Sequence, residues 1–571
     1  MNQETRQCQN CKQDFTIEPD DFAFYEKIKV PAPTFCPECR FQRRLLWRNE
    51  RTFYHRECDL CKKKIISVYS KNVFFPVYCQ KCWWSDKWDP ASYGRDFDFS
   101  RPFFEQYRDF QNTVPAISIM NDDGIGSINC EYTYDWSFSK NCYLGACGWH
   151  SENCLYVYDV NHAKDIMDCW TVNNSELVYE SINCDKCYNC RYCNLCFDSN
   201  DCVFGYDLKG CSSCAMCVGL RNKSYCILNK QYTKEQYKEE FDKLNFNSSS
   251  SVEKHQKKFD EFILKFPRKY SYISKSLNST GFFLIEAKQS KNCFYCFSPI
   301  ENSAFIVIND VAKDCYDCNN TGNPELCYES ITPDNSQGNK FSIFCWKCTE
   351  AEYSNNCHSC TSVFGSAGLK HASYAIFNKS YPKEEFLVLR EKIIDHMKKT
   401  AEYGEFFPHT FSPFAYNESP ALEWYPLSKD EALEKGHRWI EIENKKYNIT
   451  KKPEELPDLI EDVDDSILNE IIACQHDREC NEKCTTAFKI TLQELQLYRR
   501  MNIPLSKLCP NCRHYQRLSR RNPPKLWHRQ CMCDKLNHGH NGKCTNEFET
   551  SYSSDRPEIV YCEQCYNAEV A

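Results

Sequence analysis

The feature that most constrains this chain is a period of twelve residues that begins at Cys130. Steps of twelve from that position meet a cysteine or a branched apolar residue nine times in a row, at Cys130, Cys142, Cys154, Ile166, Val178, Cys190, Cys202, Cys214 and Cys226. The residue before each is usually Asn or Asp. Short strands broken by turn residues at a fixed period are typical of a solenoid. The sequence therefore predicts a parallel β-solenoid with cysteine columns inside and Asn or Asp at its bends.

A second period of 24 residues runs through the same stretch. Tyr134, Tyr158, Ile182 and Tyr206 recur at that step, and each is followed by Asp or Asn, at Asp135, Asp159, Asn183 and Asp207. Two faces of the chain therefore alternate. We expect a full coil of 24 residues with two short strands per coil.

Later in the chain the same pattern returns. ELVYESI at 176–182 reappears as ELCYESI at 325–331, and NKQYTKEQ reappears as NKSYPKEE from Asn378, both at an offset of 149. This second copy is less regular, with an expected insertion at TPDNSQGNK. Internal duplication predicts two solenoid blocks, 130–232 and 290–381, with a helical connector at 233–289. The aromatic stretch 91–129 is expected to cap the first coil, and 382–473 is expected to be a linker with a short helix.

Residues 1–90 hold four CxxC pairs: Cys8 and Cys11, Cys36 and Cys39, Cys58 and Cys61, Cys79 and Cys82. The gaps between successive pairs are 24, 18 and 17 residues. Two such pairs at this separation can place four thiolates around one zinc ion. We expect two structural zincs here, the first pair joining the second and the third joining the fourth. A closed set of four protein ligands leaves no open position for zinc catalysis.

The stretch CQNCKQDFTIEPDDFAFYEKIKVPAPTFCPECRFQRR resembles the bacterial treble-clef zinc-ribbon family, whose pattern ends in a CPxCR knuckle that opens a helix. The resemblance covers about 40 residues and implies zinc binding without implying an activity. The whole chain also resembles cysteine-rich bacterial proteins in which such ribbons flank a repetitive middle. The predicted fold class is therefore mainly β with small α+β ends.

Residues 474–571 repeat the amino-terminal module, with the same gaps of 24, 18 and 17 residues. The expected zinc ligands are Cys480, Cys484, Cys509, Cys512, Cys533, Cys544, Cys562 and Cys565. Two choices stay open at this stage. Cys474 is an alternative to Cys480, and Cys531 is an alternative to Cys533, with His538 or His540 as substitutes. About four zinc ions are expected in the two modules together.

Both modules place arginines at i, i+4 and i+8 after a CPxCR knuckle, which puts them on one helix face. These are Arg40, Arg44 and Arg48 in the first module and Arg513, Arg517 and Arg521 in the second. A fixed row of guanidinium groups suits phosphates. The alternative is a solvated basic face that pairs with nearby acids. We expect contact with RNA or DNA through these rows.

Cysteines of neighbouring predicted coils stack on one another, since Cys211 and Cys214 lie 24 residues beyond Cys187 and Cys190. Three uses are open: a reduced buried column, a structural zinc site, and an iron–sulfur or redox site.

The remaining observations concern compartment and function class. The chain of 571 residues has a net charge of −8 and 42 cysteines, with no run of eighteen apolar residues and no signal-peptide pattern. We expect a cytoplasmic protein without a membrane span, where CxxC pairs bind metal more often than they form disulfides. No phosphate loop, nucleophile motif or open metal site suggests an enzyme. The alternatives to nucleic-acid binding are a protein-interaction scaffold and a thiol redox or iron–sulfur protein.

Overall fold

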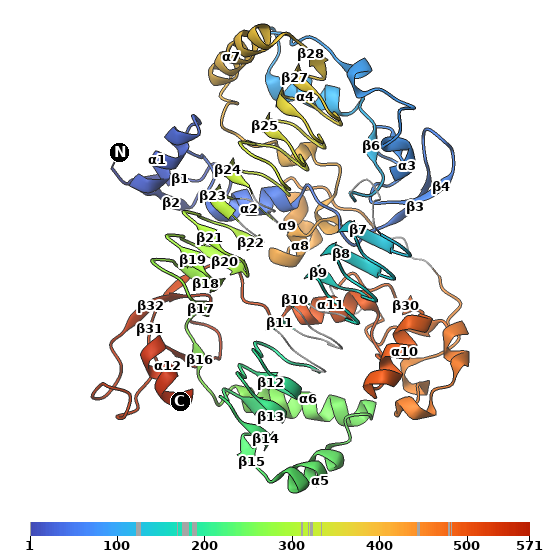
Figure 1. Ribbon diagram of the computed structural model, residues 1–571, viewed down its shortest axis with the longest axis vertical. Helices are drawn as coiled ribbons and strands as arrows, with labels where there is room; N and C mark the ends of the chain where they lie inside the picture. The colour runs from blue at the N-terminus through green and yellow to red at the C-terminus, as the bar shows by residue number, and fades with distance from the viewer. Residues whose placement is uncertain are drawn as a thin grey trace.

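The structure is a computed structural model, and it describes residues 2–121, 127–167, 170–173, 182–185, 191–309, 312–317, 319, 324–332, 334–441, 446–477, 480 and 482–570. These residues form many short strands and twelve α-helices. Two long stacks of strands, here called ladder 1 and ladder 2, overlap in the middle of the molecule and extend to its lower and upper ends (Figure 1).

Ladder 1 contains nine strands: β7 (Glu131–Ser137), β8 (Tyr143–Trp149), β9 (Tyr158–Asn161), β10 (Trp170–Asn173), β11 (Ile182–Asp185), β12 (Asn200–Tyr206), β13 (Ser212–Val218), β14 (Ser224–Ile227) and β15 (Lys230–Gln231). The strands pair in parallel with partners twelve residues apart, as Cys202 with Cys214 and Cys214 with Cys226, until β15 closes the stack antiparallel. The expected coil of 24 residues with two strands is therefore wrong. One turn of the chain takes twelve residues.

The backbone bends at every third residue of this turn. Left-handed φ angles of +50° to +63° recur at Asn129, Tyr132, Asp135, Phe138, Asn141, Leu144, Cys147, His150, Asn153 and Tyr156. Four bends per twelve residues give a turn with four short sides. The residue after a bend points inward, so Ser139, Cys142, Ser151 and Cys154 are all buried. A turn this narrow accepts only small side chains at most inward positions, which explains the cysteine and serine columns.

Hydrogen bonds between side chains tie successive turns together. Asn129, Asn141 and Asn153 each donate an amide N–H to the side-chain oxygen of the residue twelve positions later, the last to Asp165, at 2.9 to 3.2 Å. Asn and Asp tolerate the left-handed conformation better than other non-glycine residues. The predicted Asn and Asp bends are confirmed at this corner.

Trp136 is the large exception among the inward side chains of ladder 1. It is buried, and its ring lies where Cβ atoms on Gly145 and Gly148 would be, at 2.7 and 2.1 Å from them. The two glycines of the next turn therefore make room for the indole. Neither could be replaced by alanine without moving that ring.

Ladder 2 contains β17 (Ile273–Ser274), β18 (Gly281–Ile285), β19 (Ala287–Lys288), β20 (Cys293–Cys296), β21 (Ile300–Glu301), β22 (Val307–Asn309), β23 (Ala312–Tyr316), β24 (Glu325–Tyr328), β25 (Thr349–Glu352), β26 (Thr361–Phe364), β27 (Ser373–Ile376) and β28 (Lys379–Ser380). Its first turns are irregular, with pairing steps of 11, 12 and 13 residues. The expected insertion at TPDNSQGNK is wrong, because Glu325, Gln337 and Thr349 pair at an even step of twelve across it.

The terminal modules lie against the sides of the ladders (Figure 1). The first contains β1 (Glu4–Gln7), β2 (Asp14–Ile17), α1 (Pro19–Lys27), α2 (Pro37–Leu45), β3 (Tyr54–Glu57), β4 (Lys64–Ser67), β5 (Val77–Tyr78) and α3 (Gln80–Trp83). The last contains β29 (Ile472–Ala473), β30 (Ala487–Phe488), α10 (Leu492–Met501), α11 (Pro510–Leu518), β31 (Trp527–Gln530), β32 (Glu547–Thr550), β33 (Val560–Tyr561) and α12 (Glu563–Val570). In both, a knuckle helix follows the second cysteine pair.

The aromatic stretch after the first module reaches across to the far end of ladder 2. Its helix α4 (Phe103–Gln111) packs Phe103 against Phe364 and Phe377, and Pro90 accepts a hydrogen bond from Asn378. From there β6 (Ala116–Ile117) pairs with β5. The expectation that this stretch caps the first coil is wrong, since its aromatic core covers the last turn of the second copy.

Residues between and after the ladders are more structured than expected. The connector holds α5 (Lys234–Leu244), α6 (Ser249–Ile263) and β16 (Arg268–Lys269), but residues from Ile273 onward already belong to ladder 2. The segment 382–473 carries α7 (Lys383–Lys399), α8 (Ala421–Trp424) and α9 (Lys429–Glu434). Phe406, Phe407 and Trp424 are buried, so the expected linker is part of the core.

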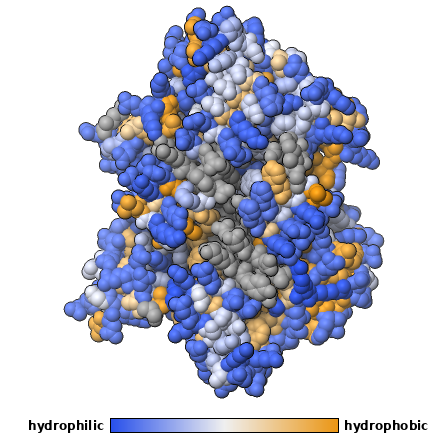
Figure 2. All heavy atoms as spheres, viewed as in Figure 1, coloured by the Kyte–Doolittle hydropathy of each residue, from blue (hydrophilic) through white to orange (hydrophobic). Residues whose placement is uncertain are grey.

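The surface is mostly polar. On the face drawn in Figure 2, hydrophilic residues predominate and apolar ones lie mainly in scattered groups at the sides. Among the described helices, none combines the length and hydropathy that a bilayer crossing requires.

Candidate metal centres

Four groups of four cysteines can each hold a metal ion. They are Cys8, Cys11, Cys36 and Cys39; Cys58, Cys61, Cys79 and Cys82; Cys474, Cys484, Cys509 and Cys512; and Cys531, Cys544, Cys562 and Cys565. Within each group all sulfurs lie within 4.8 Å of one another. The predicted pairing in the first module is confirmed by this grouping.

The sulfur spacings fit a tetrahedral zinc thiolate. A Zn–S bond of about 2.3 Å places the four sulfurs about 3.8 Å apart at the corners of a tetrahedron. The Sγ–Sγ distances are 3.8 Å for Cys11 and Cys36, 3.9 Å for Cys61 and Cys79, and 3.8 Å for Cys474 and Cys512. The cysteines are therefore spaced for an ion, at nearly twice the length of a disulfide bond.

Backbone N–H groups of the knuckles point at the sulfurs. The amide of Cys36 donates to Cys8 Sγ at 3.2 Å, and that of Cys79 donates to Cys58 Sγ at 3.2 Å. Burial raises the pKa of the Cys8 thiol, but the amides of Cys36 and Cys11 stabilise the thiolate and lower that pKa to about 7. A thiolate is the form that binds metal.

The same hydrogen bonds identify the ligands of the last module. The amide of Cys509 donates to Cys474 Sγ at 3.2 Å, and that of Cys562 donates to Cys531 Sγ at 3.1 Å. Cys474 and Cys531 thus occupy the places of Cys8 and Cys58. The preferred choices of Cys480 and Cys533 are wrong for the two four-sulfur groups, because folding brings the alternative cysteine to each site.

Cys480 and Cys533 lie beside these groups with histidines. Cys480 belongs to a second set with His476, Glu482 and Cys512, so this set shares one sulfur with the four-cysteine group. Cys533 Sγ lies 3.2 Å from His538 Nδ1, and Cys565 Sγ lies 3.3 Å from His540 Nε2. The histidines expected as substitute ligands are therefore neighbours of the group and not members of it.

The ladder cysteines have a different environment. Cys187 and Cys190 lie outside the described residues. Cys211 Sγ donates to the carbonyls of Lys209 and Leu220 at 3.5 and 3.4 Å, and Cys214 Sγ donates to that of Ser212 at 3.5 Å. All cysteines that the structure describes are free of disulfides. Of the three uses left open by the sequence, these contacts match a reduced buried column.

The arginine row of the first module is buried between the ladders. Arg40, Arg44 and Arg48 are 1%, 0% and 2% exposed. Arg40 Nε lies 2.5 Å from Asp317 Oδ2 of ladder 2, and Arg44 Nη2 lies 3.6 Å from Asp317 Oδ1. Contact of this row with RNA or DNA is a wrong prediction, because acidic groups of the same chain occupy the guanidiniums.

Arg48 joins the two ladders directly. Its Nη2 donates to Asp135 Oδ2 in ladder 1 at 3.1 Å, and its Nη1 donates to Thr332 Oγ1 in ladder 2 at 2.5 Å. Glu50 forms a further ion pair with it. Burial raises the pKa of Asp135 to about 6, although Arg48 opposes that shift. Helix α2 therefore holds the ladders together by charge.

The second arginine row lies in an equivalent place on α11 and in the loop that follows. Arg513 and Arg517 are 1% and 3% exposed. Arg513 Nη1 lies 3.1 Å from Glu494 Oε1, and its guanidinium is stacked 4.8 Å from the Tyr156 ring of ladder 1. Arg521 stacks at 3.3 Å on Trp424, and burial lowers its pKa to about 10. The row predicted to bind nucleic acid is again internal.

Sequence reasoning missed the partners of these arginines, although one signal pointed to them. Asp135 and Asp207 belong to the Tyr–Asp pairs that recur every 24 residues. Asp135 accepts from Arg48, and Asp207 accepts from Arg221 at 3.0 Å and from Tyr566 of α12. That period marks corners that meet the terminal modules. It does not mark the length of a turn.

Comparisons with known proteins add no assignment. No protein-family model matches the sequence, and a search of curated proteins finds no significant match.

Proposed function

We propose that this chain is a structural zinc protein that serves as a rigid scaffold for a macromolecular partner and catalyses no reaction. The observation that carries the proposal is the joint placement of cysteine groups and arginine helices. Each knuckle opens a helix, and each helix carries its arginines into the interior between the ladders. Four zinc ions would thus fix the parts that hold the ladders together.

Three features support a structural role for the metal. Each group supplies four thiolates, which fills a tetrahedral zinc site and leaves no position for substrate. The groups are largely buried. Modules of this size have little core of their own, so metal binding would contribute directly to their folding. The likeness to treble-clef zinc ribbons belongs to the same proposal.

The ladders supply the scaffold. Parallel pairing at a step of twelve residues, with small inward side chains, supports the assignment of each ladder as a β-solenoid. Solenoids offer long, regular side surfaces to partners. The burial of both arginine rows favours this role over nucleic-acid binding, which needs accessible cations.

Metal analysis of the native protein tests the proposal. We expect four zinc ions per chain, and three in the Cys36→Ser variant, with Cys130→Ser in ladder 1 as the matched control at four. The native protein should show no salt-sensitive binding to RNA or DNA. Fewer than three zincs in the native protein would contradict the structural role, and salt-sensitive nucleic-acid binding would contradict the scaffold.

A further inference from the structure

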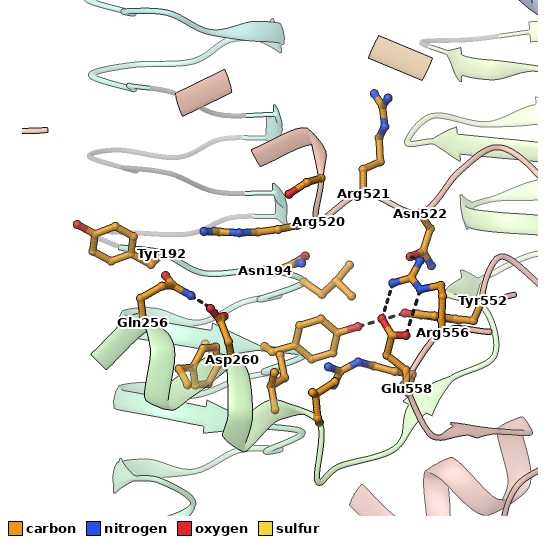
Figure 3. A pocket seen from close by; sticks show the side chains of 18 of the residues that line it. Tyr192, Asn194, Gln256, Asp260, Arg520, Arg521, Asn522, Tyr552, Arg556 and Glu558 are labelled. Atoms are coloured by element: carbon orange, nitrogen blue, oxygen red, sulfur yellow. Dashed lines mark hydrogen bonds and ion pairs between the residues drawn. The ribbon is translucent and has the colours of Figure 1, made fainter. Parts of the chain in front are cut away.

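A cavity of about 280 Å³ lies where ladder 1, ladder 2, helix α6 and the carboxy-terminal module meet. Residues from β12, α6, β16 and the loops that follow α11 and β32 line it. Figure 3 shows Tyr192, Asn194 and Arg520 on one side and Asn522, Tyr552, Arg556 and Glu558 on the other. It is separate from the four cysteine groups.

Two buried donors in this cavity have no acceptor. Arg268 is 5% exposed and Asn522 is 6% exposed, and both line the cavity. Arg268 Nη1 and Asn522 Nδ2 make no hydrogen bond to any residue that the structure describes. A buried donor left unsatisfied costs about 1 to 3 kcal/mol. Native proteins rarely keep such groups without a use for them.

The acidic groups of the cavity are already engaged. Arg556 forms an ion pair with Glu558 and donates through Nη1 to Asn522 Oδ1 at 2.9 Å. Asp260 accepts a hydrogen bond from Gln256 Nε2 at 2.7 Å. These contacts consume acceptors and leave the two donors facing the space. An anion would satisfy both.

The charges of the lining favour an anion as well. Four arginines, Arg268, Arg520, Arg521 and Arg556, face two acidic residues, Asp260 and Glu558. Arg521 points away toward α8, while Arg520 is exposed and extends across the cavity toward Asn194 (Figure 3). Without Arg521, three guanidiniums stand against two carboxylates. The cavity therefore keeps a positive excess.

Aromatic rings form the rest of the wall. Tyr206, Phe282, Tyr295 and Tyr552 line the cavity, and the Arg268 guanidinium lies 4.1 Å from the Tyr206 ring centre. Tyr206 and Tyr552 join through their hydroxyls at 3.3 Å. Flat aromatic walls beside guanidiniums suit a ligand that has both a planar ring and a negative charge.

We propose that this cavity binds a small organic anion, a phosphate or carboxylate attached to a planar ring. Arg268 and Asn522 hold the charged group, the ring packs among the tyrosines, and Arg520 closes over the opening. Site and ligand are independent of the zinc proposal, because no cysteine contributes to the lining.

Isothermal titration calorimetry on the full zinc-loaded chain tests this with four probes. Phenyl phosphate and benzoate carry ring and charge, inorganic phosphate carries charge alone, and benzyl alcohol carries a ring alone. We expect at least one of the two aromatic anions to bind at least tenfold more tightly than either of the partial probes. Their ranking distinguishes a phosphate ligand from a carboxylate ligand.

Three variants locate the binding. Arg268→Gln should weaken it about tenfold, in line with the loss of one charge-assisted hydrogen bond. Arg520→Gln should weaken it severalfold and cannot disturb the core, because that side chain is exposed. Arg500→Gln, an exposed arginine outside the cavity, is the matched control and should bind as the native protein does. Absent binding of both aromatic anions at millimolar concentration, or equal binding by benzyl alcohol, would overturn the proposal. Unchanged affinity in Arg520→Gln together with Arg268→Gln would overturn it as well.

Discussion

Arg40 and Asp317 illustrate how the molecule uses charge at the level of single residues. Their side chains are 1% and 0% exposed and lie 2.5 Å apart, although 277 residues separate them in sequence. Removing water from two charges is costly, and a close partner offsets that cost. The pair is therefore sensitive to the loss of either member.

Arg40→Gln should destabilise the protein by about 3 to 5 kcal/mol, because Asp317 would remain buried with only Arg44 near it. Urea unfolding followed by tryptophan fluorescence would measure this. Arg101→Gln on the exposed pair with Glu105 is the control and should leave the unfolding midpoint unchanged. Equal midpoints for both variants would show that the buried pair contributes nothing.

His358 makes stability depend on acidity. Burial, together with Lys347 and Lys370, lowers its pKa from 6.5 to about 3, so the folded state keeps the imidazole neutral. The unfolded chain binds a proton at higher pH than the folded chain does. The free energy of unfolding should therefore fall as pH drops below about 6.5 and keep falling toward pH 3, by about 2 to 4 kcal/mol in total.

His358→Gln should remove most of this fall, since glutamine does not titrate and can still bond to Asn356. Urea unfolding at pH 7.5 and pH 5, with zinc content checked at each, measures the difference. The exposed His150→Gln is the matched control and should keep the native pH dependence. The same pH dependence in all three proteins would contradict the assignment to His358.

Among the elements, the knuckles show what chain spacing can and cannot predict. Spacing predicted the pairing of Cys8 with Cys36 and of Cys58 with Cys79, because each pair closes a short loop within one module. It could not choose between Cys474 and Cys480. That choice depends on which sulfur meets the Cys509 amide, and this is a property of the folded backbone.

Zinc content of four single variants tests the ligand choice. Cys474→Ser and Cys531→Ser should each lose one zinc ion per chain, because each removes one of four ligands. Cys480→Ser and Cys533→Ser are the matched controls and should retain all four ions, since their sulfurs lie beside the groups. The reverse pattern in either pair would restore the choice made from spacing alone.

The ladder strands show a similar limit. The period that starts at Cys130 predicted stacked parallel strands, but the second period at Tyr134 suggested a turn twice too long. Periods in sequence give multiples of a turn, whereas the left-handed bends at every third residue decide its length. The arginine rows failed for a related reason. A helix face can be predicted locally, but the acid that covers it lies hundreds of residues away.

For the whole molecule, the proposed zinc sites and the ion pairs act in series. If metal fixes α2 and α11, and these helices hold the ladders, then metal removal should open the molecule while each ladder keeps its own backbone bonds. A compact chain of 571 residues has a radius of gyration of about 25 Å.

A chelator should raise that radius clearly in small-angle X-ray scattering, while the β signal in circular dichroism stays largely intact. Returning zinc should restore the compact state. The same chelator saturated with zinc is the control. An unchanged radius after complete zinc removal would show that packing alone joins the ladders.

The twelve-residue turn also limits how such a molecule can change its size. Deleting one residue would rotate every later side chain to a different side of the turn, whereas deleting twelve would remove one rung of about 4.8 Å and leave all other residues in place. Arg48 bridges the ladders where they overlap, so whole rungs could be added or lost only toward the outer ends. Length in this architecture is counted in rungs, and the distance between its two ends can change only in steps of that height.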